Sequence, residues 1–168
     1  NEYLAAHGIG PAPMIERADY VFGNLLGPRD VTGPAAHNYL VERLAVIAAL
    51  EHMFPFLGDW VLNAENLNER PVHPVVLDLL RWHGAEEVEH RHVSFNVAKY
   101  FGMDYFAQAA AGLMVSVVLP VVLLRGLKFI IHADPALPNL GYLRIIGKLR
   151  RSARSGAVPG LGFWVRAP

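Results

Sequence analysis

The sequence predicts an all-α protein, a helical bundle, on three observations. The 168 residues contain long runs typical of helices and no strand-like alternation of apolar and polar residues. Hydrophobic residues make up 53% of the chain and charged residues 18%, which is enough apolar material for a sizeable core. One predicted helix also carries glutamates and histidines at the spacing by which helical bundles hold metal ions.

Proline and glycine divide the first hundred residues into predicted helices over 14–26, 35–63 and 74–102. Pro55 is expected to kink the second of these helices. Pro74 suits the first turn of the third, and Gly102 suits its carboxyl end. Residues 63–74, between the second and third helices, predict a polar connection.

Residues 105–124 form an uncharged, mainly apolar stretch of twenty residues, followed at once by Arg125 and Lys128. This length is sufficient to span a bilayer. A central helix of a bundle has the same composition, and Gln108 and Pro120 dilute the hydrophobicity. We therefore keep two interpretations, a membrane-contacting helix and a soluble core helix that lines a substrate pocket.

The charges are unevenly distributed along the chain. Six basic residues and no acidic residue follow Asp134, so the tail carries +6 and the preceding part −6. Residues 139–154 predict a basic amphipathic helix, which would lie either on an anionic membrane or on the bundle. We expect residues 1–134 to form the metal-binding bundle portion and 135–168 a basic, partly helical tail. No signal-peptide pattern opens the chain, and a start within a longer protein is one interpretation. We expect a cytoplasmic protein, with membrane association through 105–124 and the tail as an option.

The predicted metal ligands lie within residues 82–92. On a helical wheel His83, Glu87 and His90 fall within about 60° of one another, on a face shared with apolar residues, so we expect this face to be buried. Buried imidazoles and carboxylates need a partner, which a metal ion provides. A hydrogen-bond network among the three side chains themselves is the alternative. Glu86 lies at the edge of this face and is predicted to be an extra ligand or the catalytic proton carrier.

Other side chains of the same segment are predicted to lie outside the site. Glu89 and His92 point away from the apolar face, which indicates a solvated strip.

Glu51 lies in an almost wholly apolar helix, the one predicted over 35–63, and a lone carboxylate there would be costly. We predict that it is the metal ligand of the neighbouring helix. Its neighbour His52 points about 100° away and is expected to support the site or face solvent.

The chain contains no cysteine, so a metal must be held by histidine, aspartate, glutamate or water. A glutamate on one helix facing Glu-x-x-His on another is half of the carboxylate-bridged two-metal pattern. Two iron ions are therefore the predicted cofactor, with manganese or zinc as alternatives. The zero net charge predicts no nucleic-acid partner.

The motifs at Glu51 and 82–90 resemble those of a bacterial family of predicted metal-dependent hydrolases. The matching residues are ALEH at 49–52, WHxxEExEH at 82–90, and VxF at 93–95. The resemblance implies a ferritin-like helical fold and covers most of the chain. Asn96 departs from the pattern, because relatives commonly have aspartate after this phenylalanine.

The resemblance also implies that the ligand set is incomplete. In this family two further ligand-bearing helices usually precede a segment similar to NExLxxxG at residues 1–8. We therefore expect a carboxyl-terminal part of the bundle, completed by an amino-terminal segment or by a partner chain.

Two reactions suit these ligands. By analogy with helical-bundle metal sites we favour oxygen-dependent oxidation of an apolar small-molecule substrate. Metal-dependent hydrolysis, as the family's description states, is the alternative, since metal-bound water is a nucleophile. A non-catalytic metal-binding protein and a membrane-associated structural subunit are the other options. A Ser-His-Asp hydrolase is not expected, because the sequence lacks a Gly-x-Ser-x-Gly motif.

Overall fold

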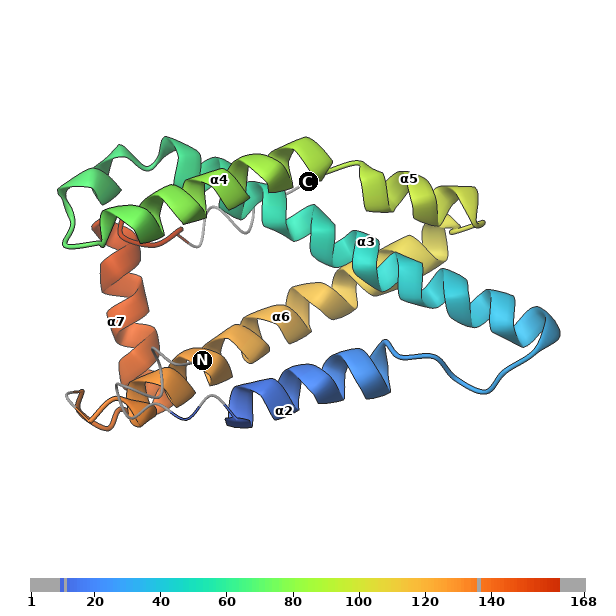
Figure 1. The fold of residues 1–168 in the computed structure, drawn as a ribbon, viewed down its shortest axis with the longest axis horizontal. Coiled ribbons are helices and arrows are strands. Elements are labelled where there is room, and N and C mark those ends of the chain that lie inside the picture. The colour runs from blue at the N-terminus through green and yellow to red at the C-terminus, as the bar shows by residue number, and fades with distance from the viewer. Residues whose placement is uncertain (1–9, 11, 136, 161–168) are drawn as a thin grey trace.

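The structure of the protein, a computed structural model, describes residues 10, 12–135 and 137–160. Over these ranges it contains helices and turns and no strand, which confirms the all-α class (Figure 1). The ferritin-like arrangement stays a prediction. The elements are α2 (Ala12–Tyr20), the π-helix η1 (Val21–Leu25), α3 (Gly33–Asn63), the 3₁₀ helix η2 (Glu65–Glu69), α4 (Pro74–His90), α5 (Val93–Tyr100), α6 (Tyr105–Ala133) and α7 (Tyr142–Arg154).

Helix α3 is the centre of the fold, because it contacts α4, α5 and α6. It runs antiparallel to α4, while α6 crosses below it (Figure 1). Helix α7 stands across one end, between the end of α6 and the turn that joins α3 to α4. The side chains of Asn66 and Arg70 in that turn donate hydrogen bonds to backbone carbonyls at Ser155 and Gly156, just after α7. These bonds fix the end of α7 against η2.

Most of the predicted helices are confirmed. The one expected over 14–26 is α2 followed by the π-helical turn η1. The one expected over 35–63 is α3, which begins two residues earlier because Pro34 is compatible with a first turn. Pro55 lies inside this continuous helix. The apolar stretch 105–124 continues to Ala133 as α6.

The single helix predicted over 74–102 is wrong, because the structure divides it at Arg91 and His92 into α4 and α5. Neither glycine nor proline lies at this break. The physical reason is tertiary: α4 packs on α3 through Gly84, whereas α5 packs through Ala98, which has no exposed surface and contacts the Ala45 and Ala48 cluster. A break lets both segments follow α3.

The backbones of α3 and α4 approach each other most closely at Gly58 and Gly84. A Cβ atom placed on Gly58 would lie 2.3 Å from the carbonyl oxygen of Gly84. Such a distance is far inside van der Waals contact, so this crossing requires glycine. It fixes the register of the two helices that carry the predicted metal ligands.

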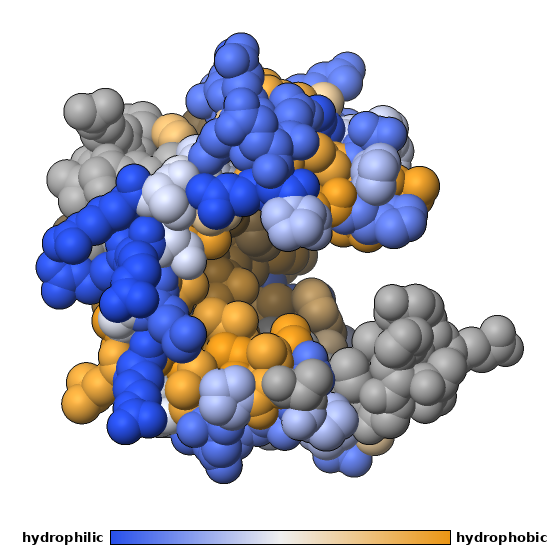
Figure 2. Space-filling view, turned by 90° about the vertical axis from the view of Figure 1, so that its left-hand side faces the viewer, coloured by the Kyte–Doolittle hydropathy of each residue, from blue (hydrophilic) through white to orange (hydrophobic). Residues whose placement is uncertain are grey.

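The chain exposes much more surface than a compact protein of its size. Its accessible area is 12004 Å², whereas a compact monomer of 18.5 kDa would expose roughly 8200 Å². Figure 2 shows apolar side chains lining a deep hollow with a hydrophilic rim. Much of this apolar surface therefore has no cover within the described residues.

Helix α6 contributes strongly to the exposed apolar surface. By length and composition it is able to cross a membrane, and only 11% of its most apolar stretch is buried. One such helix is weak evidence, because core helices of soluble proteins have the same composition. Membrane contact stays a prediction.

Asp104 sets the beginning of α6. Its carboxylate accepts a hydrogen bond from the backbone N–H of Ala107, with an O–N distance of 2.7 Å. We expect Asp104→Ala to lower the free energy of unfolding by about 1 kcal/mol, because an orphan N–H loses its cap. Urea unfolding measures this, with Asp104→Asn as the matched control, since asparagine also caps. Equal stability of the alanine variant and the wild type would contradict this role.

Candidate functional site

Helix α4 brings two of the predicted metal ligands into contact. His83 Nε2 lies 3.2 Å from Glu87 Oε1, one helical turn away. The His83 side chain is 63% exposed and that of Glu87 18% exposed. An imidazole nitrogen and a carboxylate oxygen at this spacing are able to chelate one divalent ion from one helix.

The face that carries this pair is not buried, and the prediction that it is buried is wrong for the described chain. Val76, Leu79 and Leu80, which share the face, are about half exposed. Helix α4 instead buries Leu77 and Gly84. The Gly58 and Gly84 crossing fixes this orientation, and the break after His90 places the apolar residues from Val93 onward in a separate helix.

Glu51 lies on the side of α3 that faces α4. It precedes Gly58 by seven residues, or two turns, so both lie on one stripe of the helix. Helices α3 and α4 are antiparallel and cross at Gly58 and Gly84. A residue that precedes Gly58 in α3, such as Glu51, therefore lies on the same side of the crossing as a residue that follows Gly84 in α4, such as His90. Glu51 is partly buried, and His90 is exposed at the last residue of α4.

The described residues do not by themselves assemble a metal site. No group of three or more histidine, aspartate or glutamate side chains converges within them. A metal ion in a protein usually has four or more ligands. In the ranges that the structure describes, Glu51, Glu86 and His90 make no side-chain hydrogen bond or ion pair. The donor chemistry fits a metal ion, and the four predicted ligands stay predictions.

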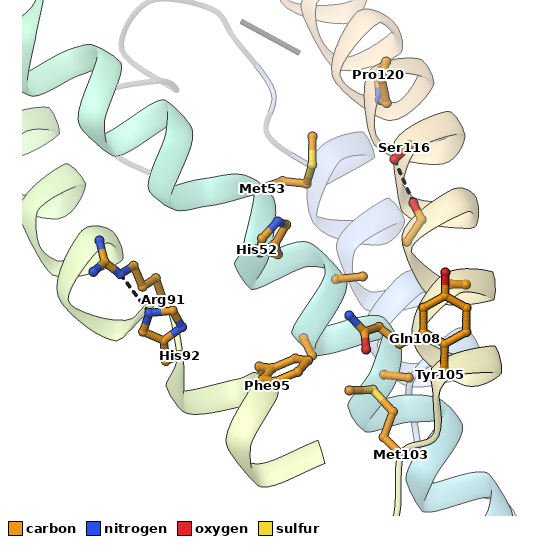
Figure 3. A pocket seen from close by; sticks show the side chains of 15 residues that line it. His52, Met53, Arg91, His92, Phe95, Met103, Tyr105, Gln108, Ser116 and Pro120 are labelled. Atoms are coloured by element: carbon orange, nitrogen blue, oxygen red, sulfur yellow. Dashed lines mark hydrogen bonds between the residues drawn. The ribbon is translucent and has the colours of Figure 1, made fainter. Parts of the chain in front are cut away.

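A cavity of about 610 Å³ is lined by residues next to two of the predicted ligands in the chain, His52 after Glu51 and Arg91 after His90, although none of the predicted ligands itself lines it. Helix α3 forms its floor, the start of α5 forms one side, and α6 forms the other (Figure 3). Helix α6 contributes six of the lining residues. The lining residues are Ala45, Ala48, Ala49, His52, Met53, Arg91, His92, Phe95, Met103, Tyr105, Gln108, Ala109, Gly112, Ser116 and Pro120.

Two histidines that the sequence placed outside the metal site are part of this cavity. His52 lies on its floor and His92 on its side, beside Arg91. In the chain, His52 directly follows the predicted ligand Glu51, and His92 lies two residues after the predicted ligand His90. The helical wheel missed His92 because it assumed one straight helix over 74–102, whereas His52 lies in the continuous helix α3 and was expected to support the site or face solvent.

The chain matches a known protein family. Over residues 1–167 the chain matches the family described as predicted metal-dependent hydrolases. Searches of curated proteins and of solved structures found no match. The family match spans nearly the whole chain, including Glu51, the histidine and glutamate pair of α4, and the cavity. The chain belongs to this family of predicted metal-dependent hydrolases.

Proposed function

We propose that this protein is a metal-dependent hydrolase that acts on an apolar substrate. The observation that carries the proposal is the 3.2 Å pair of His83 and Glu87, on a helix that faces Glu51 across the glycine crossing. The family description supports hydrolysis. This description favours hydrolysis, which was the alternative in the sequence analysis, over oxygen-dependent oxidation.

In this proposal His83 and Glu87 hold the ion, with His90 and Glu51 as further ligands. The bound ion would supply an activated water at neutral pH. Glu86 is partly buried and adjoins Glu87 in the chain, so we assign it the transfer of a proton beside the site. The largely apolar cavity binds and orients the substrate. Nitrogen and oxygen donors suit iron, manganese and zinc, and iron remains our proposed metal.

We also propose that the ligand set is completed by further protein. Two converging donors are fewer than a metal site needs. The exposed apolar residues around the pair and the surplus accessible area support a further helical segment packed on this face. This segment would be an amino-terminal part of the polypeptide or a partner chain.

Chelation tests the proposed reaction. The substrates are p-nitrophenyl esters of increasing acyl length, given to the full chain before and after treatment with EDTA. We expect cleavage to disappear with EDTA, to return with added Fe²⁺, Mn²⁺ or Zn²⁺, and to increase with acyl length because the cavity is apolar. Glu89→Gln is the matched control, since this exposed side chain of α4 is outside the proposed site.

The other outcomes discriminate among the functions. Cleavage that is insensitive to EDTA would overturn metal-dependent hydrolysis. Metal binding without cleavage of any ester would favour a storage or structural role. Oxygen consumption with apolar substrates, without ester cleavage, would restore the oxidation reaction.

A further inference from the structure

The cavity between α3, α5 and α6 combines an apolar interior with a cationic side. We propose that it binds a long-chain carboxylate, with the apolar chain over α3 and along α6 and the carboxylate at Arg91. This ligand assignment rests on the proposed function in one respect, because hydrolysis of an acyl ester by water yields a carboxylate and an alcohol, and the carboxylate would be a product of the proposed reaction. Binding itself is measurable without any metal.

Helix α6 presents a continuous stripe to the cavity. Residues Tyr105, Ala109, Gly112, Ser116 and Pro120 follow one another at intervals of three or four, and all line the cavity. At 1.5 Å per residue this stripe is roughly 22 Å long, which suits an extended acyl chain. The small side chains in its middle leave the width for such a chain.

The polar atoms of this stripe are largely satisfied or lie at its ends. Ser116 Oγ donates a hydrogen bond of 2.7 Å to the carbonyl oxygen of Gly112 in its own helix. The hydroxyl therefore has a partner without a ligand. Across the cavity, Ala45, Ala48 and Ala49 of α3 form the apolar part of a floor that also includes His52, and Gln108 of α6 adds one amide to the lining. A slot of this kind favours methylene groups over polar ones.

The head-group side is formed by Arg91 and His92. Arg91 Nε donates to His92 Nε2 at 3.0 Å, which leaves the terminal guanidinium N–H groups for other acceptors. If the imidazole is neutral, its proton then lies on Nδ1, which adds a donor. No aspartate or glutamate lines the cavity, and within the described residues Arg91 has no carboxylate partner.

This charge selects the ligand class. A guanidinium binds a carboxylate through paired, charge-assisted hydrogen bonds. A cationic ligand would be repelled, and a neutral alcohol would form weaker bonds. An apolar slot with arginine on one side therefore matches an acyl carboxylate better than a hydrocarbon, an alcohol or an amine of the same length.

The test is calorimetric binding of dodecanoate, below its micellar concentration, to the full chain after EDTA treatment. We expect saturable binding by the wild type. Arg91→Gln should weaken it about tenfold or more, since a hydrogen bond to a charged group is lost. Dodecan-1-ol should bind the wild type more weakly than dodecanoate and should be little affected by Arg91→Gln. Arg144→Gln, an exposed arginine of α7 outside the cavity, is the matched control.

A second variant tests the slot itself. A Cβ atom on Gly112 meets nothing within 4 Å and Gly112 lines the cavity, so we expect Gly112→Leu to place its side chain in the cavity without a clash at its Cβ. It should abolish dodecanoate binding, whereas Gly147→Leu, an equally open helical glycine outside the cavity, should not. Unchanged binding by Gly112→Leu, equal affinity for the alcohol, or no dodecanoate binding by the wild type would each overturn the inference. The binding experiment contains no metal, so its result neither supports nor contradicts metal-dependent ester cleavage, which the chelation experiment tests.

Discussion

Replacing Gly58 with alanine should destabilise the protein by about 3 kcal/mol, the upper end of the usual cost of overpacking. The new Cβ would meet the carbonyl oxygen of Gly84 at 2.3 Å and its carbonyl carbon at 3.0 Å. Both atoms are backbone, so neither moves away unless α3 and α4 separate. Separation would also displace Glu51 from the α4 ligands. Urea unfolding of the full chain measures the effect.

The chain offers graded controls for this substitution. A Cβ on Gly84 meets its nearest atom, the Cα of Gly58, at 3.0 Å, so Gly84→Ala should cost less than Gly58→Ala. Gly147→Ala meets nothing within 4 Å and should stabilise α7 by about 0.5–1 kcal/mol, the usual difference between the two residues in a helix. Stability of Gly58→Ala equal to that of the wild type would show that the two helices do not cross through these glycines.

Replacing Glu87 with glutamine should reduce the rate of metal-dependent ester cleavage by about a hundredfold or more. Mutation of a residue that only supports a metal ligand already lowers metal affinity or activity by about 10–100-fold. Glutamine has nearly the same shape as glutamate but no charge, so α4 should keep its packing. Its amide is a poor ligand and would leave His83 without the carboxylate 3.2 Å away. Initial rates with a saturating concentration of the same metal measure the loss.

The matched control is again Glu89→Gln, which removes the same charge from an exposed position of the same helix. It should retain the wild-type rate within about twofold, as expected for an exposed substitution outside the site. A full rate in Glu87→Gln would remove this carboxylate from the proposed centre. Equal losses in both variants would instead indicate a general effect of negative charge on α4.

Local sequence signals predicted the extent of the helices well where proline, glycine or a cap marks an end. Pro74 at the start of α4 is such a signal, whereas the apolar stretch 105–124 did not indicate that α6 continues to Ala133. The break at Arg91 and His92 has no such signal. It depends on where Ala98 packs against α3, and that contact is between residues far apart in the sequence.

The candidate site was predictable in part for the same reason. The spacing of His83 and Glu87 determines that they are neighbours on a helix, and the structure places them in contact. Which face of α4 is buried depends on the glycine crossing, so the wheel gave the wrong answer for Val76 and Leu79. The cavity involves three helices and was foreseen only as an apolar lining on α6.

Metal content per chain is the most direct test of the central claim that α4 holds a metal ion. Elemental analysis of the purified protein, coupled to an intact-mass measurement, should find iron, manganese or zinc in the wild type and in Glu89→Gln. The double variant His83→Ala with Glu87→Gln should have lost the metal while keeping the helical circular dichroism of the wild type. The same metal content in the double variant as in the wild type would contradict the claim.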